Sequence, residues 1–123
     1  MRERSLTELS GNYDVKMQDR RRGHRFSPPK DVLSKIPALY TTEDSVAAAK
    51  IVYVHYFTGS CDWYIVELDP ETGIAFGYAD LGDPQNAEWG YVDLTELGTV
   101  EGPFGIGVER DLHWTPKRFD EVR

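Results

Sequence analysis

The chain has 123 residues, of which 40% are hydrophobic and 28% charged, and its formal net charge is −7. This length fits one domain, whose core can bury about two-thirds of the unfolded surface. The single Cys61 excludes an internal disulfide and fits a reducing compartment. The sequence has no apolar run of membrane-spanning length and lacks the apolar centre of a signal peptide, so we expect a cytoplasmic protein.

Charge is distributed unevenly along the chain. Residues 1–35 contain nine Lys or Arg and five Asp or Glu, whereas the remainder contains five and sixteen. Between Lys50 and Arg110 there is no lysine or arginine, and 11 carboxylates fall in this stretch. A surface with one sign of charge repels nucleic acid and anionic membrane and attracts basic surfaces. The sequence therefore predicts a basic arm followed by an acidic folded body.

The first 28 residues are predicted to form a polar, basic arm. Ser5–Glu8 has a capping-box pattern and predicts a short helix that Gly11 ends. We interpret Arg20–Arg25 as a solvated linker, with nucleic-acid binding as the alternative.

Two short helical segments are predicted before the first strand. Ser27–Pro29 predicts a helix start with serine as the cap, and Pro37 ends that helix. Thr42–Ser45 is interpreted either as the cap of a turn through Ala47–Ala49 or simply as a loop.

The remainder is predicted to be rich in strands. The expected strands cover residues 51–57, 63–68 and 74–79, a segment around Trp89 and Tyr91, and residues 106–114. The first is apolar on both faces and predicts a central strand, while the third has one bulky and one small face, and the small face suits a packed helix. Asp93–Glu96 has a second capping-box pattern, and Gly98 ends that helix.

These elements predict an α+β domain over residues 29–119, followed by a tail at 120–123. Connections of hairpin length indicate an antiparallel sheet of about five strands, with short helices packed on one side.

One group of residues suggests catalytic or metal chemistry. In an extended strand, Glu109, Asp111 and His113 would share one face. Together with His55 they would form a metal site, or a general base oriented by an acid. We prefer the simpler interpretation, in which Arg110 pairs with a carboxylate and His113 is a hydrogen-bonded strand residue. No cofactor, metal or catalytic residue is therefore predicted.

Several segments occur in an order that indicates a family. They are Ile36–Asp44, Tyr56–Thr58, Asp62–Tyr64, Phe76–Gly77, Gly90–Leu97 and Gly102–Pro116, and the last is the most specific. Over about residues 29–119 the chain resembles the small bacterial domain-of-unknown-function family numbered 2958. The resemblance implies an accessory protein of a plasmid, phage or other mobile element, in a context of anti-restriction and DNA-processing genes, and carries over no activity. The motif positions that are candidates for a site are Tyr40, Trp63, Tyr64, Tyr91, Glu96, Glu109, Arg110, Asp111 and His113.

The leading hypothesis is a non-enzymatic protein that binds a basic protein surface, such as that of a DNA-handling or defence enzyme, by imitating the charge of DNA. The carboxylates expected to make this contact are Asp62, Glu67, Asp69, Glu71, Asp80, Asp83, Glu88 and Glu101. One alternative is a small metal-binding protein or hydrolase that uses His55, Glu109, Asp111 and His113. Another is an oligomerisation module whose edge strand pairs with itself. We expect a monomer or small homo-oligomer whose acidic body does not contact nucleic acid.

Overall fold

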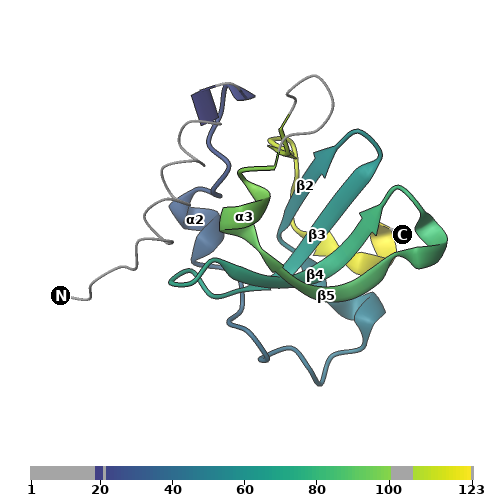
Figure 1. Cartoon of the computed structure of the whole chain (residues 1–123). Helices are drawn as coiled ribbons and strands as arrows, with labels where there is room; N and C mark the ends of the chain where they lie inside the picture. The colour runs from purple at the N-terminus through teal and green to yellow at the C-terminus, as the bar shows by residue number, and fades with distance from the viewer. Residues whose placement is uncertain (1–18, 21, 101–106, 123) are drawn as a thin grey trace.

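The computed structural model describes residues 19–20, 22–100 and 107–122 (Figure 1). Its helical elements are α2 (Lys30–Leu33), η1 (Ala47–Ala49), η2 (Pro84–Asn86), α3 (Leu94–Leu97) and η4 (Phe119–Glu121). Its strands are β1 (Ile51–Val52), β2 (Val54–Thr58), β3 (Cys61–Leu68), β4 (Ile74–Leu81), β5 (Glu88–Asp93), β6 (Glu109–Arg110) and β7 (Lys117–Arg118). Within the described ranges, no helix is long and apolar enough to cross a membrane.

Five strands form one antiparallel sheet in the order β5-β4-β3-β2-β6, and β1 pairs with β7 in a separate two-stranded sheet. The strands β2 to β5 follow one another as a meander, which confirms the predicted antiparallel sheet, and the short helices fit an α+β or a mostly-β small domain. Short turns make this possible, because Gly59, Gly73 and Gly82 adopt positive φ angles in the three connections of the meander.

The predicted central strand over residues 51–57 is in fact two strands. The chain breaks at Tyr53, whose N–H donates to the carbonyl of Ile65 at 2.9 Å, and β1 then pairs with β7. The side chains of Val52 and Val54 consequently face different core clusters. The central strand of the sheet is β3.

The first face of the sheet carries the larger core cluster. Tyr56, Ile65 and Ala75 are buried there beneath α2 and α3, and Leu94 and Leu97 of α3 belong to the same cluster. Helix α3 begins as predicted, because the Asp93 side chain accepts hydrogen bonds from the N–H groups at positions 95 and 96.

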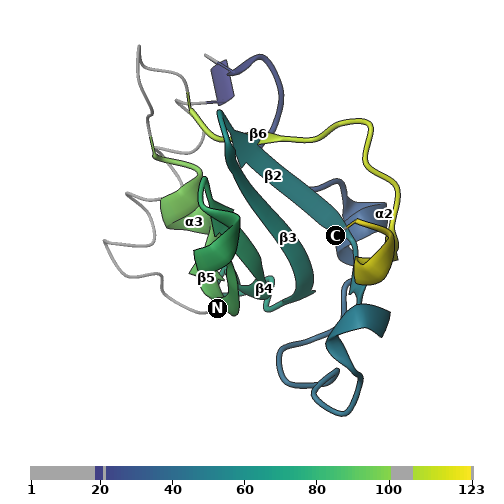
Figure 2. The same ribbon diagram turned by 90° about the vertical axis from the view of Figure 1, so that its right-hand side faces the viewer.

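The opposite face carries a second cluster that the carboxy-terminal segment covers. Val66 is buried in it, and Trp114 and Phe119 pack against it. Figure 2 shows α3 and this segment on opposite sides of the sheet. The prediction of helices on one side therefore holds for α2 and α3, whereas the 3-10 turn η4 lies on the other side.

The cap predicted for the first helix is wrong, and of the two interpretations of Thr42–Ser45 the loop is the one observed. The residue preceding α2 is Pro29, and no side chain caps that helix. The 3-10 turn η1 forms where a short turn was expected, but Val46 precedes it and no side chain caps it either. The Thr42 side chain has a different partner, the buried Glu67.

The predicted strand over residues 106–114 is also shorter than expected. Its described part contains β6, which pairs with β2 through Glu109 and Arg110. The chain then turns, because the Asp111 side chain accepts the His113 N–H at 3.0 Å and ends the extended conformation.

Part of the predicted arm belongs to the core. Phe26 is 2% exposed and stacks on Tyr56 at 4.3 Å. The guanidinium of Arg22 donates to the carbonyl oxygens of Gly98 and Val108 and lies over the Phe26 ring. The interpretation of Arg20–Arg25 as a solvated linker is therefore wrong for Arg22. The predicted helix over Ser5–Glu8 lies outside the described residues.

Candidate functional site

His55 forms the centre of a polar cluster on the second face of the sheet. Its Nε2 lies 2.7 Å from Oδ1 of Asp62, and its Nδ1 lies 3.1 Å from Oδ2 of Asp111. The hairpin places Asp62 there, because it follows the β2–β3 turn. Asp111 arrives from the segment after β6, where its N–H donates to the His55 carbonyl at 2.8 Å. Two carboxylates from distant parts of the chain thus hold one imidazole.

Aromatic rings enclose this imidazole. The Tyr64 ring stacks on it at 4.8 Å with an interplanar angle of 8°, and the Trp114 ring lies at 5.2 Å. Trp114 is itself held by its indole N–H, which donates to the carbonyl of Val52 at 2.9 Å. Each carboxylate faces a different nitrogen of the ring, so the cluster links β2, β3 and the carboxy-terminal segment through hydrogen bonds.

The surroundings of Asp111 change its pKa. Its partial burial acts to raise its pKa, but hydrogen bonds from His55 and from the His113 N–H favour the charged form. The net result is a pKa below the ordinary aspartate value.

The proposed His55, Glu109, Asp111 and His113 site does not assemble. Only His55 and Asp111 meet. Glu109 lies 3.7 Å from His24, and the exposed His113 contributes its backbone N–H to Asp111. In the described parts of the chain, no three His, Cys, Asp or Glu side chains are grouped so that they could hold a metal ion. The strand ends at Arg110, so the residues predicted to share one face do not do so.

A second polar cluster surrounds Glu67, which is 2% exposed. Its carboxylate accepts the Tyr40 N–H at 2.7 Å, the Thr42 N–H at 3.1 Å and the Thr42 hydroxyl. A β-bulge between residues 65 and 67 aims this side chain toward the loop that precedes η1. Glu67 therefore fixes that loop on β3, and Tyr40 adopts a positive φ of 70° there.

This loop and β5 present two exposed tyrosines side by side. The rings of Tyr40 and Tyr91 are 5.9 Å apart, and they are 60% and 56% exposed as residues. Partial desolvation and the neighbouring Tyr40 raise the pKa of Tyr91. The negative charge of Glu43 raises it further. Glu43 and Lys50 line a recess of about 210 Å³ beside Tyr91, where the Lys50 ammonium donates to the Thr42 carbonyl.

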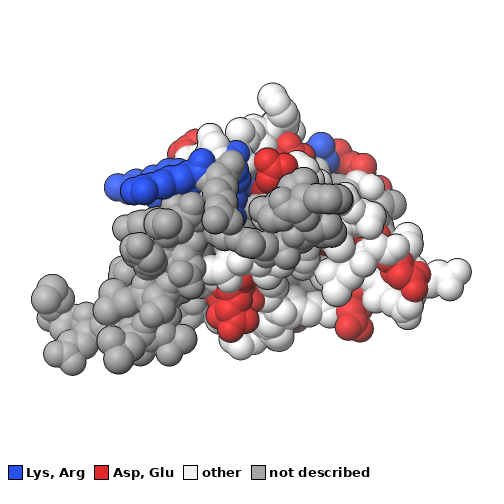
Figure 3. All heavy atoms as spheres, turned by 45° about the horizontal axis from the view of Figure 1, so that its top comes forward, with Lys and Arg blue, Asp and Glu red and all other residues white. Residues whose placement is uncertain are grey.

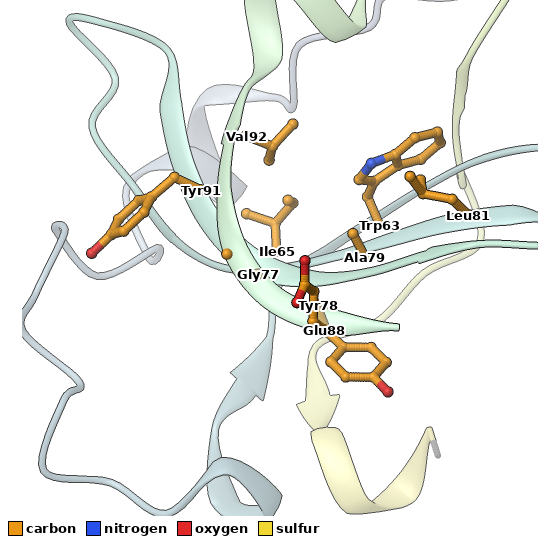
Figure 4. A pocket seen from close by; sticks show the side chains of 10 residues that line it. Trp63, Ile65, Gly77, Tyr78, Ala79, Leu81, Glu88, Tyr91 and Val92 are labelled. Atoms are coloured by element: carbon orange, nitrogen blue, oxygen red, sulfur yellow. The ribbon is translucent and has the colours of Figure 1, made fainter. Parts of the chain in front are cut away.

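An apolar groove of about 240 Å³ lies on the first face of the sheet (Figure 4). All of its lining residues belong to β3, β4 or β5. Trp63, Leu81 and Val92 border it, while the Tyr91 side chain points away from it. A Cβ atom added to Gly90 would meet nothing within 4 Å, so the groove is open above this residue.

The carboxylates predicted to form a binding surface fall into different environments. Glu67 and Asp80 are 2% and 4% exposed, so the structure excludes both from an accessible surface. Asp62 is bound to His55, and Glu101 lies outside the described residues. The remaining four lie at the surface or partly so, and they are Asp69 and Glu71 beside the β3–β4 turn and Asp83 and Glu88 at the β4–β5 connection.

The other motif residues lie in different parts of the fold and do not form a common site. Tyr64 is buried in the second cluster, and Arg110 donates from Nε to the carbonyl of Arg25 at 3.1 Å. Glu96 is exposed in the first turn of α3. Sequence reasoning missed the hydrogen bonds by which the buried Glu67 holds the loop of Tyr40 and Thr42. The available signal was a single glutamate within the apolar run Ile65–Leu68, since a buried carboxylate requires partners.

Fold and site together define a small protein built on one five-stranded antiparallel sheet, with an apolar groove and two carboxylate clusters. The family model described as a protein of unknown function, DUF2958, matches residues 33–119, and the chain belongs to this family. The family predicted from the sequence is thereby confirmed. Comparisons with curated proteins and with solved structures gave no match.

Proposed function

We propose that this protein is a non-enzymatic, acidic accessory protein that binds a basic surface of another protein. The observation that carries the proposal is the absence of lysine and arginine from residue 51 to residue 109, combined with exposed carboxylates beside β5. We call the residues concerned the β5 surface, and they are Tyr40, Glu43, Asp83, Glu88 and Tyr91. Exposed aromatic rings next to carboxylates are typical of a protein interface, and Lys50, which also lies beside Tyr91, donates to Thr42.

The distribution of charge favours a local contact. Most of the Lys and Arg atoms visible in Figure 3 gather on one side, while Asp and Glu form separate groups elsewhere. The β3–β4 turn and the β4–β5 connection lie at opposite ends of β4, so their carboxylates do not form a continuous row. This arrangement supports recognition of one basic patch more than imitation of a DNA duplex.

The His55 cluster favours a structural role over catalysis. Both ring nitrogens already face carboxylates, so neither is directed at a substrate or a metal ion. The family resemblance adds the expectation that the partner handles nucleic acid or serves defence on a mobile element, which makes such basic-surfaced enzymes the first partners to test.

Affinity capture of the tagged full chain from host lysate tests this proposal. The column is washed at low and then at high salt, and the retained proteins are identified by mass spectrometry. Glu88→Lys lies within the β5 surface, and Asp31→Lys on α2 changes the net charge equally at another exposed position. We expect a partner that is released at high salt, because exposed charges are screened.

The same partner should be lost in Glu88→Lys and kept in Asp31→Lys. Equal retention by both variants would contradict a contact through the β5 surface, and an empty capture at both salt concentrations would overturn the proposed function.

A further inference from the structure

We propose that the free edge of β5 binds an extended, basic segment of the partner by backbone pairing. This inference rests on the proposed function and names the form in which the partner meets the β5 surface. In addition to electrostatic attraction, a strand of the partner would pair with β5 and extend the sheet β5-β4-β3-β2-β6.

The edge itself is the first observation. β5 is the terminal strand of the sheet, and among the described residues no strand pairs with its outer side. In an antiparallel sheet, alternate residues of an edge strand direct their N–H and C=O groups outward, where another strand can bind them. β5 pairs with β4 over its full length from Glu88 to Asp93, so its backbone is held extended as a template.

The groove beside this edge is the second observation. On one face of β5 the side chains alternate as Glu88, Gly90 and Val92, and the missing side chain at Gly90 leaves open space above the strand. A large apolar side chain on an added strand opposite Gly90 would cover this glycine and reach the groove beside Trp63.

The other face of β5 offers an aromatic contact. Tyr91 is exposed there and lies next to Tyr40. An arginine on the added strand opposite Tyr91 would lie on the ring, with Glu43 nearby to balance its charge.

Charge favours a foreign segment over a second copy of this chain. Directly opposed residues in an antiparallel pair lie on the same face, so two copies of β5 would pair with Gly90 opposite Gly90 or with Tyr91 opposite Tyr91. Either register brings together two edges that carry Glu88 and Asp93 and no lysine or arginine, so the two copies repel. A segment with lysines opposite Glu88 and Asp93 replaces this repulsion by attraction.

These positions specify a probe. A cyclic β-hairpin presents an outer strand with lysines opposite Glu88 and Asp93, phenylalanine opposite Gly90, arginine opposite Tyr91 and valines at the two remaining positions. Cyclisation holds the strand extended and removes most of the ordering cost of binding. A matched hairpin has the same side chains but carries N-methyl groups on the outward amides, which prevents backbone pairing and leaves the charge unchanged.

Amide hydrogen exchange of the full-length protein and titration with both hairpins test the proposal. We expect the outward amides of β5 to exchange rapidly in the free protein and to become protected by the unmodified hairpin. N-methylation should weaken binding by roughly tenfold or more, since two or three hydrogen bonds are lost. Gly90→Leu fills the open space without a backbone clash and should weaken binding while leaving the fold intact.

Other results would overturn the inference. Equal affinity for the two hairpins would show attraction without strand pairing, and failure of the unmodified hairpin to bind would exclude this edge. Protection of β5 in the free monomer would place residues of the same chain there, and protection that rises with protein concentration would place a second copy there. If capture remains sensitive to salt and to Glu88→Lys while the hairpins bind equally, the proposed function stands and only strand pairing fails.

Discussion

At the scale of single residues, two carboxylates hold distant parts of the chain together. Glu67 accepts three hydrogen bonds from Tyr40 and Thr42, and Asp111 joins the segment after β6 to His55. Glu67 is buried and Asp111 is partly exposed, but each carboxylate has defined donors, so its role is structural. Some of the carboxylates of this acidic chain therefore hold the fold together and are not available at the surface for a partner.

Replacing Glu67 by alanine should destabilise the fold. The N–H groups of Tyr40 and Thr42 would lose their acceptor inside the protein, which corresponds to about 2–4 kcal/mol of unfolding free energy. Urea denaturation measures this change. Glu88→Ala is the matched control at an exposed position and should leave the denaturation midpoint unchanged. Equal denaturation midpoints for the two variants would contradict the stabilising role of the Glu67 hydrogen bonds.

The lowered pKa of Asp111 predicts a pH dependence. Because its folded-state pKa lies below its unfolded value, its stabilising contribution is complete above a pH of about 4 and is lost as pH falls through the folded-state pKa. Asp111→Asn should therefore lower the unfolding free energy at neutral pH and lose less stability on acidification. Denaturation at a series of pH values tests this, and curves that run parallel down to low pH would count against the His55 cluster.

At the scale of elements, turn and capping residues in the sequence predicted the meander. Pairing between strands that are distant along the chain left no pattern in the sequence. Each hairpin of β2 to β5 closes through a turn that glycine and proline mark in the sequence, and Asp93 caps α3 as its spacing indicates. The break at Tyr53 depends on β7, which comes more than sixty residues later, so no local pattern shows it. The same reason explains why Asp62 was assigned to the surface and His113 to the site, because the contacts of His55 with Asp62 and Asp111 form only in the folded chain.

Two glycines in paired strands should respond oppositely to alanine. At Gly77 a Cβ atom would lie 2.2 Å from the carbonyl oxygen of Tyr64, so the β3 backbone must move, at a cost of about 1–3 kcal/mol. At Gly90 the space is open, and alanine should be neutral or stabilise by a few tenths of a kcal/mol, up to about 1. Thermal unfolding of both variants measures the contrast, and similar losses in both would contradict the pairing of β4 with β3 and β5.

The carboxy-terminal segment should be required for the second face of the sheet. Phe119 lies 4.9 Å from the Tyr78 ring and 4.7 Å from the Trp89 ring. Phe119→Ala should lower stability by about 2–3 kcal/mol, because the ring is partly buried and leaves a gap. Glu121→Ala in the same turn is exposed and serves as the control. Unchanged stability in Phe119→Ala would mean that η4 does not pack on the sheet.

At the scale of the whole molecule, charge is partitioned between regions that fold together. Exposed lysines and arginines gather in the segment from Arg20 to Lys35, while the meander from β2 to β5 contains no lysine or arginine. This partition was evident from the sequence alone, because counting charges needs no knowledge of contacts. The sequence did not show which carboxylates are buried, since Glu67 and Asp80 differ from their exposed neighbours only in the partners that the fold brings to them.

The association rate of the captured partner, measured as a function of ionic strength, tests the central claim most directly. The account predicts a rate that falls steeply as salt rises, because opposite charges steer the two surfaces together. Glu88→Lys should associate more slowly and with a shallower salt dependence, whereas Asp31→Lys should resemble the wild type. A rate that is independent of salt, or an equal effect of the two substitutions, would contradict recognition of a basic partner through the β5 surface.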